Sequence, residues 1–554
     1  MTTTTPALAL GLLLLAACPT FAAQNVKPPN ILLIVADDLG FSDLSALGSE
    51  IATPHLDKLM RGGQLMLDFH AAPSCSPTRA MLMSGNDPHL SGIGMMAEAR
   101  GRLPEGSEVR PGYEGVLGGN VATLAELLQD AGYRTYIAGK WHLGKQPEQQ
   151  PQNRGFDDAN VLLEGGAAHF KQQNMGLLPN YSWTFRHNGE PVELPENFYS
   201  TQWFTDRLIE SIDQGKASHK PFFAFAAYTA PHWPLQAPDE YLAKYRGRYD
   251  QGYEAIARER LERQRKAGLV PADYPMTPQF EGVPAWASLT PEQQHQSART
   301  MEVYAAMVEA LDAEVGRLVE HLRSSGELDN TLILFMSDNG PENANRADPN
   351  WVKTHFDNSL QNYGRRDSFL MVGPAWAQVS ALPSRRYKMT TYQGGIRVPA
   401  FVYYPASIKP GRSEELASVR DIMPTLLQLA GAPMPGIQYK GRAIVPPQGT
   451  SALPYLEGQD TQIHGRDEAL GWEINGNASL RKGDFKLLFD PTDAQPAWRL
   501  FDLARDPGEH QDLAAQQPER VTAMLRDWRA YAQRSNIALT PDGRPEYPPL
   551  LPRP

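Results

Sequence analysis

The stretch Ile31-Leu32-Leu33-Ile34-Val35 is continuously apolar, and the acids Asp37-Asp38 follow it almost at once. A short, uninterrupted apolar run predicts a strand that is buried on both faces, as in a parallel sheet covered by helices. In such sheets ligands bind beyond the carboxyl ends of the strands. The stretch therefore predicts both a fold class and the edge of the sheet at which a site is expected.

Four further apolar runs follow along the chain, and three of them end in polar residues. They are residues 133–138 before Gly139-Lys140-Trp141-His142, residues 222–228 before Pro231-His232-Trp233, residues 331–336 before Ser337-Asp338-Asn339-Gly340, and residues 398–404. Helical patterns lie between the runs. Thr123 and Glu126 form a capping-box pair, and apolar residues from Val303 to Leu322 mark one face of a longer helix. Alternating strands and helices predict a mainly parallel sheet, on which the polar ends converge.

The chain changes character after residue 431. Residues 432–449 are rich in Pro and Gly, as in a linker, and 480–489 and 498–503 then predict antiparallel strands before a helix at 518–535. We expect an α/β fold with a large mixed, mainly parallel sheet sandwiched by helices at residues 23–440. A smaller C-terminal α+β domain with an antiparallel sheet is expected at 441–554. Residues 241–266, dense in Arg, Lys and Glu, predict a solvated helix that carries no site.

The composition narrows the function classes. The 554 residues carry a net charge of −11, which argues against a general nucleic-acid binder because such proteins present a basic face. Apolar residues make up 41% and charged residues 21%, as in a globular protein. No apolar run beyond the N-terminus approaches the roughly 20 residues that a membrane helix needs.

The N-terminus predicts export. The apolar stretch 7–17 is short, which fits the core of a signal peptide better than a membrane span. Thr20-Phe21-Ala22 offers small residues for a cut, so we expect a signal peptide at residues 1–22 and a periplasmic protein. The alternative is a lipoprotein, because Leu15-Ala16-Ala17-Cys18 resembles a lipobox that would lipidate Cys18.

Asp37-Asp38 and Asp338-Asn339 offer only oxygen ligands. Adjacent acids at one strand end repel each other unless a cation compensates them, and oxygen donors suit Ca²⁺ or Mg²⁺ rather than Zn²⁺. The alternative is that Asp37 or Asp338 caps a helix. Because both pairs follow buried strands, we favour a metal site.

Cys75 is the one cysteine outside the N-terminal segment. Pro77 is placed to begin a helix that ends near Gly85, so Cys75 would lie at a helix N-terminus, which favours negative charge on a bound group. Arg79 would return one turn later on the same face. The residues alone leave two readings open, a reactive thiol or anion site and an inert core cysteine.

Together these segments resemble the type I sulfatases of the alkaline phosphatase superfamily. Cys75-x-Pro77-x-Arg79 matches the signature in which the cysteine is converted to formylglycine, and residues 132–135 leading to 139–142 match the second signature. Further similar segments are 36–40, 230–234, 337–340, 394–399, 500–503 and 506–509, and residues 357–360 and 373–378 resemble the bacterial arylsulfatase of the Pseudomonas type. The resemblance covers nearly everything from residue 30 to residue 513.

The resemblance implies an arylsulfatase, which hydrolyses an aryl sulfate ester to a phenol and inorganic sulfate. One hydroxyl of the hydrated formylglycine (3-oxoalanine) would attack sulfur, and the second would drive the release of sulfate. One Ca²⁺ per chain would polarise the ester as a Lewis acid. The implied metal ligands are Asp37, Asp38, Asp338, Asn339 and the formylglycine made from Cys75. The implied catalytic residues are Cys75, Arg79, Lys140, His142, His232 and Lys388, with His142 as the base in sulfate release and Lys140, His232 and Lys388 binding sulfate.

Alternatives stay open at this point. A relative with the same nucleophile would act on alkyl or carbohydrate sulfates, phosphonate monoesters or phosphodiesters, and the fold does not decide among them. A chain in which Cys75 is never converted would only bind sulfate. We expect a monomer whose partners are a small sulfate ester and a formylglycine-generating maturation enzyme, with no nucleic acid and no transmembrane helix. The rim segments 92–96 and 165–169 would set the leaving group.

Overall fold

The computed structural model describes residues 2, 28–179, 181–275, 280–343 and 348–549. The predicted signal peptide and Cys18 lie outside these residues. Among the described residues ten strands form one sheet, whose five central strands, β9-β1-β8-β4-β5, are parallel. Across the sheet the order is β11 (Gly411–Ser413), β2 (Gln64–Met66), β10 (Ala400–Tyr403), β9 (Thr331–Ser337), β1 (Asn30–Ala36), β8 (Phe222–Ala227), β4 (Arg134–Lys140), β5 (Asp158–Leu162), β6 (Phe185–His187) and β7 (Glu190–Pro191).

Alternate residues of β1 face two separate hydrophobic cores. Leu32 and Ile34 pack with α1 (Pro54–Gly62), α5 (Ser200–Gly215) and α8 (Pro291–Ser324). Ile31 and Leu33 pack with α2 (Cys75–Ser84), α4 (Leu124–Asp130) and α12 (Ile422–Leu429). The period of two residues follows from the pleat of the strand. The predicted sheet with helices on both faces is confirmed.

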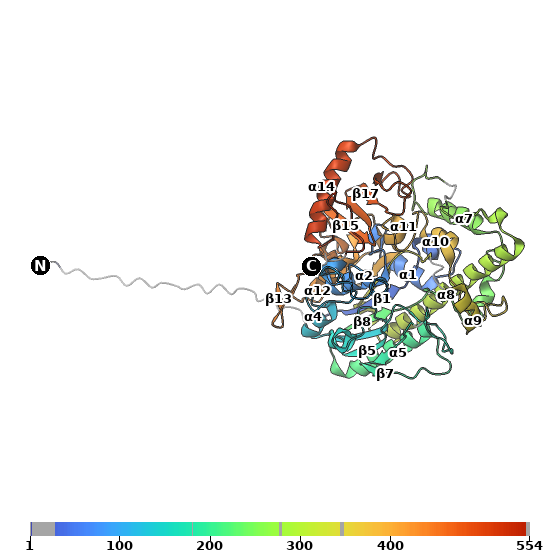
Figure 1. Cartoon of the computed structure of the whole chain (residues 1–554). Coiled ribbons are helices and arrows are strands. Elements are labelled where there is room, and N and C mark those ends of the chain that lie inside the picture. Colours follow the sequence, from blue (N-terminus) through green and yellow to red (C-terminus); the bar gives the residue numbers. More distant parts are fainter. Residues whose placement is uncertain (1, 3–27, 180, 276–279, 344–347, 550–554) are drawn as a thin grey trace.

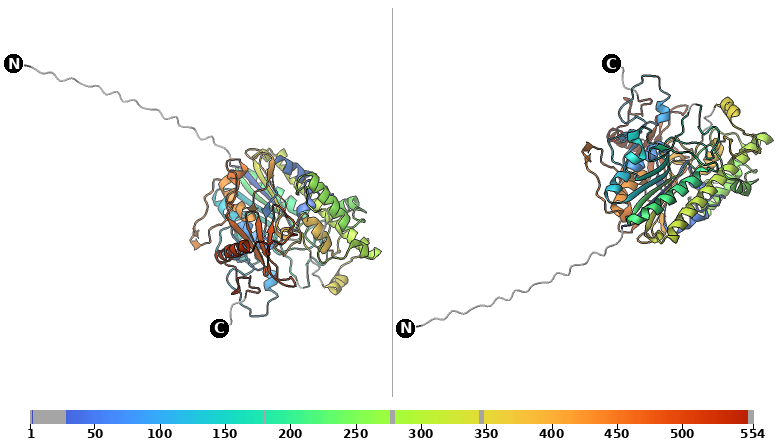
Figure 2. Two further views of the ribbon diagram at one scale, coloured as in Figure 1. Left: turned by 90° about the horizontal axis from the view of Figure 1, so that it is seen from above. Right: turned by 90° about the horizontal axis from the view of Figure 1, so that it is seen from below.

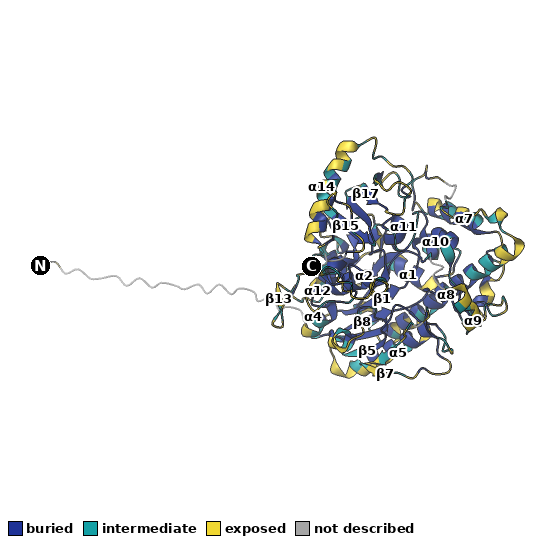
Figure 3. Ribbon diagram, viewed as in Figure 1, coloured by how far each residue is buried: buried dark blue, intermediate teal, exposed yellow. Residues whose placement is uncertain are grey.

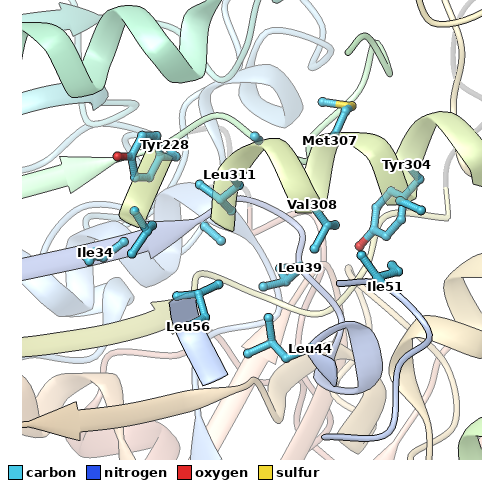
Figure 4. Packing of buried hydrophobic residues seen from close by; sticks show 14 of the residues in the cluster. Ile34, Leu39, Leu44, Ile51, Leu56, Tyr228, Tyr304, Met307, Val308 and Leu311 are labelled. Atoms are coloured by element: carbon cyan, nitrogen blue, oxygen red, sulfur yellow. The ribbon is translucent and has the colours of Figure 1, made fainter. Parts of the chain in front are cut away.

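The core on the α8 side shows how tightly the central strand is covered. Val308 and Leu311 of α8 lie on the side of the helix that faces Ile34 and Leu39, and all four are 0% exposed (Figure 4). Truncating a buried leucine to alanine in such a core costs about 2–5 kcal/mol. The helices α5 and α8 lie side by side along this face (Figures 1 and 2). Exposed residues lie on the outer sides of helices such as α14, in loops and in edge strands such as β7 (Figure 3).

The predicted strands of the large sheet and the predicted cap of α4 are present, but one strand runs in the opposite direction to its neighbour. The runs beginning at 31, 133, 222 and 331 form β1, β4, β8 and β9. Residues 398–404 do form a strand, β10, but it pairs antiparallel with β9. The helices α9, α10 and α11 lie between the two strands in sequence, but the chain enters β10 at the carboxyl edge of the sheet, where the N–H of Ser337 donates to the carbonyl of Pro399. The capping box of α4 is present, because Thr123 and Glu126 each accept a backbone N–H of the other.

The C-terminal part forms the predicted antiparallel sheet, on one side of the large sheet (Figure 1). Its strands are β15 (Ala469–Ile474), β16 (Asn477–Lys482), β17 (Phe485–Phe489) and β18 (Trp498–Asp502), covered by α14 (Pro518–Arg534). The run 480–489 is therefore two strands rather than one, because Gly483 turns the chain with φ of 54°. The predicted linker 432–449 contains a small hairpin, β13 (Gln438–Tyr439) and β14 (Arg442–Ala443).

A buried charged cluster joins the two sheets. His89 donates one ring N–H to Asp87 at 2.7 Å and pairs through its other nitrogen with Glu473 of β15, also at 2.7 Å. Tyr531 of α14 donates to the second oxygen of Asp87. Burial alone would lower the pKa of His89, but the two carboxylates outweigh burial and raise it to about 9. A buried imidazolium between two acids therefore connects the segment after α2 to the C-terminal sheet.

The helix expected to be solvated and without a role is corrected by the structure. In α7 (Tyr253–Lys266), Arg260 is fully buried and binds Asp43 at 2.6 Å and both oxygens of Glu50 at 2.8 and 2.9 Å. The sequence pattern hid this contact because one buried Arg stands among exposed Arg, Lys and Glu. The remaining short elements are β3 (Phe69–His70), β12 (Ala417–Ser418), α3 (Ala97–Arg100), α6 (Asp239–Leu242), α9 (Pro349–His355), α10 (Gly373–Ala381), α11 (Gln393–Ile396) and α13 (Leu453–Leu456). Over the residues that the structure covers, we find no helix with the length and apolarity needed to span a membrane.

Candidate active site

Neighbouring parallel strands bring the predicted site residues to one edge of the sheet. Asp37 and Asp38 follow β1, Lys140 ends β4, His232 follows β8, and Asp338 and Asn339 follow β9. Helix α2 lies against this edge and supplies Cys75 at its first residue and Arg79 one turn later. Because these strands are adjacent and parallel, their carboxyl ends meet, as the sequence predicted.

Cys75 is a buried thiol between acids. It is 3% exposed, and its Sγ lies 3.5 Å from Oδ1 of Asp37 and 4.0 Å from Oδ1 of Asp38. Burial raises the pKa of the Cys75 thiol well above its usual range, although Lys140 and Lys388 act in the opposite direction. A neutral thiol is a poor nucleophile. The reading of Cys75 as an activated thiolate is therefore not supported by its surroundings.

Three permanent cations face three buried carboxylates. Lys140 Nζ lies 2.7 Å from Oδ2 of Asp37, and Lys388 Nζ lies 2.7 and 3.0 Å from the two oxygens of Asp38. Arg79 binds Oδ2 of Asp338 through Nε at 3.2 Å and Nη2 at 2.8 Å. The remaining Nη1 of Arg79 donates to the carbonyl of Lys140 at 2.8 Å. The pairs share one compact site although they come from five segments of the chain.

Burial and charge set the protonation of the carboxylates. Burial raises the pKa of Asp37, but Lys140, Arg79 and Lys388 outweigh it, so that this pKa is lowered. Burial raises the pKa of Asp38 to about 7, with Lys388 opposing and Asp37 adding to the shift. Burial and the charge of Asp37 likewise raise the pKa of Asp338. A bound divalent cation would favour the charged form of all three acids.

The donor set fits a hard cation. Asn339 donates from Nδ2 to Oδ1 of Asp38 at 2.6 Å and to the carbonyl of Gly340 at 2.8 Å. Its Oδ1 is buried and has no hydrogen-bond partner among the described residues. An amide oxygen without a partner beside three buried carboxylates is what Ca²⁺ requires, whereas Zn²⁺ favours nitrogen and sulfur. Neither Asp37 nor Asp338 is the N-cap of a described helix, so the capping alternative is wrong.

His232 joins the same cluster. Its Nδ1 lies 2.6 Å from the carbonyl of Trp233, which assigns the proton to Nδ1 and turns Nε2 toward Oδ2 of Asp38 at 3.6 Å. Burial lowers the pKa of His232 well below its usual range, and Lys388 and Lys140 add to this. His169 supports the loop, because its Nε2 lies 2.9 Å from the carbonyl of His232. Ligand atoms of Asp37, Asp38, Cys75 and His232 all lie within 4.8 Å of one another.

His142 is placed beside the cluster rather than in it. No hydrogen bond or ion pair between described residues joins it to Cys75 or to the three acids. Its Nε2 lies 3.1 Å from Oε1 of Glu98, and its side chain lines an open cavity of about 620 Å³ with Glu98 and Tyr181. Of the predicted catalytic residues, five are brought together, and His142 forms the wall of the adjoining cavity.

An aromatic surface borders His232 on another side. The ring of Trp233 stacks on that of His232 at 5.2 Å and meets the edge of Phe369 at 5.7 Å. We call this cluster the apolar wall; it consists of Leu177, Leu178, Tyr181, Trp233, Trp351, Val352, Phe356, Phe369 and Met371. An open cavity of about 590 Å³, lined in part by Phe356 and Phe369, lies against the same wall.

Sequence reasoning missed three supporting residues. Glu342 lies 3.3 Å from Lys388, Glu98 binds His142, and Tyr181 donates to Glu98 at 3.3 Å. None of them belongs to a motif that the sequence analysis quoted. Lys388, which only the family resemblance singled out, is 4% exposed and bound to Asp38.

Comparison with known proteins agrees with this site. The family described as Sulfatase matches residues 29–432, and the family described as N-sulphoglucosamine sulphohydrolase, C-terminal, matches residues 386–530. An uncharacterized sulfatase of Schizosaccharomyces pombe is 42% identical over 530 residues, 93% of this chain and 95% of that protein. The arylsulfatase of Klebsiella aerogenes is 39% identical over 432 residues, 77% of this chain and 91% of that enzyme.

A solved structure shows the same fold. The crystal structure of Ps i-CgsB in complex with k-i-k-neocarrahexaose has a TM-score of 0.65 and 27% sequence identity, over 91% of this chain and 93% of that chain. With a family match over most of the chain and the family's signature residues gathered at one edge of the sheet, the assignment is settled. The chain belongs to the sulfatase family, as a type I sulfatase of the alkaline phosphatase superfamily and a sulfuric ester hydrolase.

Proposed function

We propose that the protein is an arylsulfatase that hydrolyses aryl sulfate esters to a phenol and inorganic sulfate. The observation that carries the proposal is the position of Cys75, a neutral buried thiol at the start of α2, between Asp37 and the cations Lys140 and Lys388. Ca²⁺ would be held by Asp37, Asp38, Asp338 and Asn339, and when bound it would supply a Lewis acid that polarises the ester. Formylglycine made from Cys75 would supply a hydrated aldehyde as the nucleophile.

The side chains of the site then have separate tasks. Arg79 and Lys140 hold Asp338 and Asp37, and so fix the acids on either side of residue 75. Lys388 and Lys140 bring positive charge to a crevice of a protein whose net charge is −11. His232 turns Nε2 into the crevice, and a bound anion there would favour its protonated form, which stabilises the departing oxygen. His142 would accept a proton during sulfate release.

The walls of the site indicate which leaving group fits. Trp233 and Phe369 of the apolar wall offer flat, apolar surfaces beside His232, which suit an aryl ring better than a hydrated sugar. The 39% identity to an arylsulfatase supports the same substrate class. The second candidate is a carbohydrate sulfate. The cavity beside His142 favours it, because Arg102, Lys145 and Glu164 line that cavity with polar groups.

The test compares substrates on one enzyme. Protein co-expressed with a formylglycine-generating enzyme would be assayed with an aryl sulfate, an aryl phosphonate monoester and a sugar sulfate, with and without a chelator. We expect the aryl sulfate to have the highest kcat/KM, and we expect the chelator and Cys75→Ala each to remove nearly all turnover. A higher kcat/KM for the phosphonate or the sugar sulfate would contradict the aryl assignment, while the loss on Cys75→Ala would still support the nucleophile.

A substitution in the apolar wall tests whether that wall binds the aryl group. Phe369→Ala should raise KM for the aryl sulfate about tenfold, since burial of a phenyl face contributes about 1–3 kcal/mol, and should leave a small alkyl sulfate nearly unaffected. The matched control is Phe485→Ala, because Phe485 lies in β17 and packs on the core of the C-terminal sheet. Equal effects of Phe369→Ala on both esters would count against the wall as the aryl site.

We also propose that residues 1–22 direct export to the periplasm and that the large domain ends near residue 440. The short apolar stretch 7–17 supports export, and the match of the Sulfatase family up to residue 432 supports the boundary. N-terminal sequencing of protein isolated from the periplasmic fraction tests the first proposal. A start at Ala23 is expected, whereas a lipid-modified Cys18 would replace it with a membrane-bound form.

A further inference from the structure

The carboxylate of Glu98 makes a contact that no motif of the chain predicts. Glu98 lies in α3, far from the strands that supply the site, yet its Oε1 is 3.1 Å from Nε2 of His142. Its pKa is lowered: burial would raise it, but the charge and hydrogen bond of His142, together with Lys140, outweigh burial. Glu98 is therefore ionised at neutral pH and can only accept a hydrogen bond from His142.

This contact decides which ring nitrogen of His142 carries the proton. A carboxylate at Nε2 requires an Nε2–H donor, so the neutral ring carries its lone pair on Nδ1. Nδ1 is buried and has no hydrogen-bond partner among the described residues. A buried acceptor left without a partner costs about 1–3 kcal/mol, so it marks a place where a ligand or a reacting group supplies the missing donor.

The ring is also held in place from its other sides. Tyr181 donates to Oε1 of Glu98 at 3.3 Å and accepts the backbone N–H of Gly165 at 3.0 Å. A Cβ at Gly165 would lie 2.8 Å from Cε1 and 2.9 Å from Nε2 of His142, so only glycine leaves room for the ring in this orientation. Lys145 and Glu164 line the same cavity, but neither forms a hydrogen bond or ion pair with the ring among the described residues. Glu98 is thus the one charged group bound to His142 among the described residues.

We propose that Glu98 is a positioning residue for sulfate release: it fixes the Nε2–H tautomer of His142 and aims Nδ1 as the proton acceptor. The inference rests on the proposed function, because it assigns a task to a group acting on His142 in that reaction. The arrangement follows the general dyad of an imidazole whose far nitrogen is held by a carboxylate. The proton taken by Nδ1 comes from the hydroxyl left on residue 75, as the bond from that carbon to the sulfate oxygen breaks and the C=O bond re-forms.

The first test needs neither metal nor formylglycine. Unconverted Cys75→Ala protein, labelled with ring-¹⁵N histidine, reports the tautomer of each histidine by NMR, and the His142 signals are identified by their loss in His142→Gln. We expect His142 to be protonated on Nε2, and we expect Glu98→Ala to give a mixture of the two tautomers. An unchanged tautomer in Glu98→Ala would overturn the proposal. Glu105→Gln is the matched control, because Glu105 is exposed on the same segment.

The second test separates the two halves of the reaction. With converted enzyme and an aryl sulfate, Glu98→Gln should release the first phenol at nearly the wild-type rate and then turn over about tenfold to a hundredfold more slowly, which is the usual effect of removing such a partner. The phenol burst should equal the enzyme concentration. Glu98→Gln should add no further loss in a His142→Ala background, because the two residues act as one unit.

The outcomes separate failure of the Glu98 proposal from failure of the proposed arylsulfatase function. If Glu98→Gln turns over at the wild-type rate without a burst, Glu98 has no part in release and the inference is wrong while the arylsulfatase stands. If converted wild type releases no phenol from an aryl sulfate, the proposed function fails first. A slower burst in Glu98→Gln, with an unchanged ratio of the two phases, would place the effect on the first step and overturn the assignment to release.

Discussion

Arg260→Met tests how α7 supports the loop that carries the candidate metal ligands Asp37 and Asp38. The fully buried guanidinium makes three hydrogen bonds to the carboxylates of Asp43 and Glu50, whose side chains are 0% and 3% exposed. Methionine has a similar volume but leaves Asp43 without its cation and Glu50 with only the partly exposed Arg263, 3.8 Å away. Breaking a buried pair in this way costs about 3–5 kcal/mol.

Loss of Arg260 should also affect the candidate metal ligands. Asp43 also accepts the backbone N–H of Gly40 at 2.9 Å and the hydroxyl of Tyr304 at 2.7 Å, and that hydroxyl lies 3.4 Å from the carbonyl of Asp38. Asp38 has a positive φ of 66°, which a non-glycine residue keeps only when its surroundings hold it. Loss of Arg260 is therefore expected to loosen the loop 37–43 and to weaken Ca²⁺ binding.

The stability difference between wild type and Arg260→Met should depend on pH. Burial would raise the pKa of Glu50, but Arg260 and its hydrogen bonds outweigh burial and lower it from 4.5 to about 2. The pair therefore stabilises wild type above pH 4.5, and this contribution is lost as the pH falls toward 2. In Arg260→Met the two acids take up protons more readily, so the difference between the two proteins should shrink on acidification.

The assay is urea unfolding at pH 7 and pH 4, with hydrogen exchange of peptides that cover residues 37–50. We expect a lower midpoint and faster exchange in Arg260→Met at pH 7, and a smaller difference at pH 4. Arg265→Met is the matched control, because Arg265 lies on the same helix, is 40% exposed and pairs with Glu262 rather than with Glu50. An unchanged midpoint and unchanged exchange in Arg260→Met would refute the argument.

Three further predictions follow from the same geometry. Asn339→Ala should weaken Ca²⁺ binding about tenfold or more by calorimetry, because one oxygen ligand is lost, and an unchanged affinity would remove this residue from the ligand set. The pKa of His89 is raised to about 9, so its contribution of roughly 3 kcal/mol to the free energy of unfolding is present below pH 6.5 and lost as the pH rises through about 9. The melting temperature should therefore fall between pH 7 and pH 10 in wild type and fall less in His89→Gln. Equal falls in the two proteins would contradict a charged His89. Gly165→Ala should lower kcat at least tenfold, because its Cβ collides with the ring of His142, and wild-type kcat would show that the ring can move.

Much of the fold could be predicted because strand ends carry local signals. The run 31–35 and the acids after it predicted both the parallel core and the position of the site. The direction of β10 could not be predicted, because an apolar run looks the same in a parallel and in an antiparallel pair. The buried position of Arg260 was equally hidden, since helix patterns record average polarity and one buried charge with distant partners does not change that average.

The same limit applies within the site. Cys75, Arg79 and the acids were found because their segments carry recognisable spacing. Glu98 was not, because its partner His142 lies 44 positions away and the contact depends on how α3 folds over the cavity. No local sequence pattern marked Lys388. In the structure its Nζ lies 2.7 Å from Oδ1 of Asp38, which stands 350 positions earlier in the chain. Contacts of this kind are set by tertiary packing and leave no periodic trace in the sequence.

The central claim is that formylglycine made from Cys75 is the nucleophile of an arylsulfatase. Its most direct test is to prepare enzyme with different degrees of conversion, measure the fraction of formylglycine in the peptide that contains residue 75 by mass spectrometry, and measure aryl sulfate turnover on the same samples. The account predicts that turnover is proportional to the converted fraction and extrapolates to zero for the unmodified thiol. Turnover that is independent of conversion, or that persists in Cys75→Ala, would contradict it.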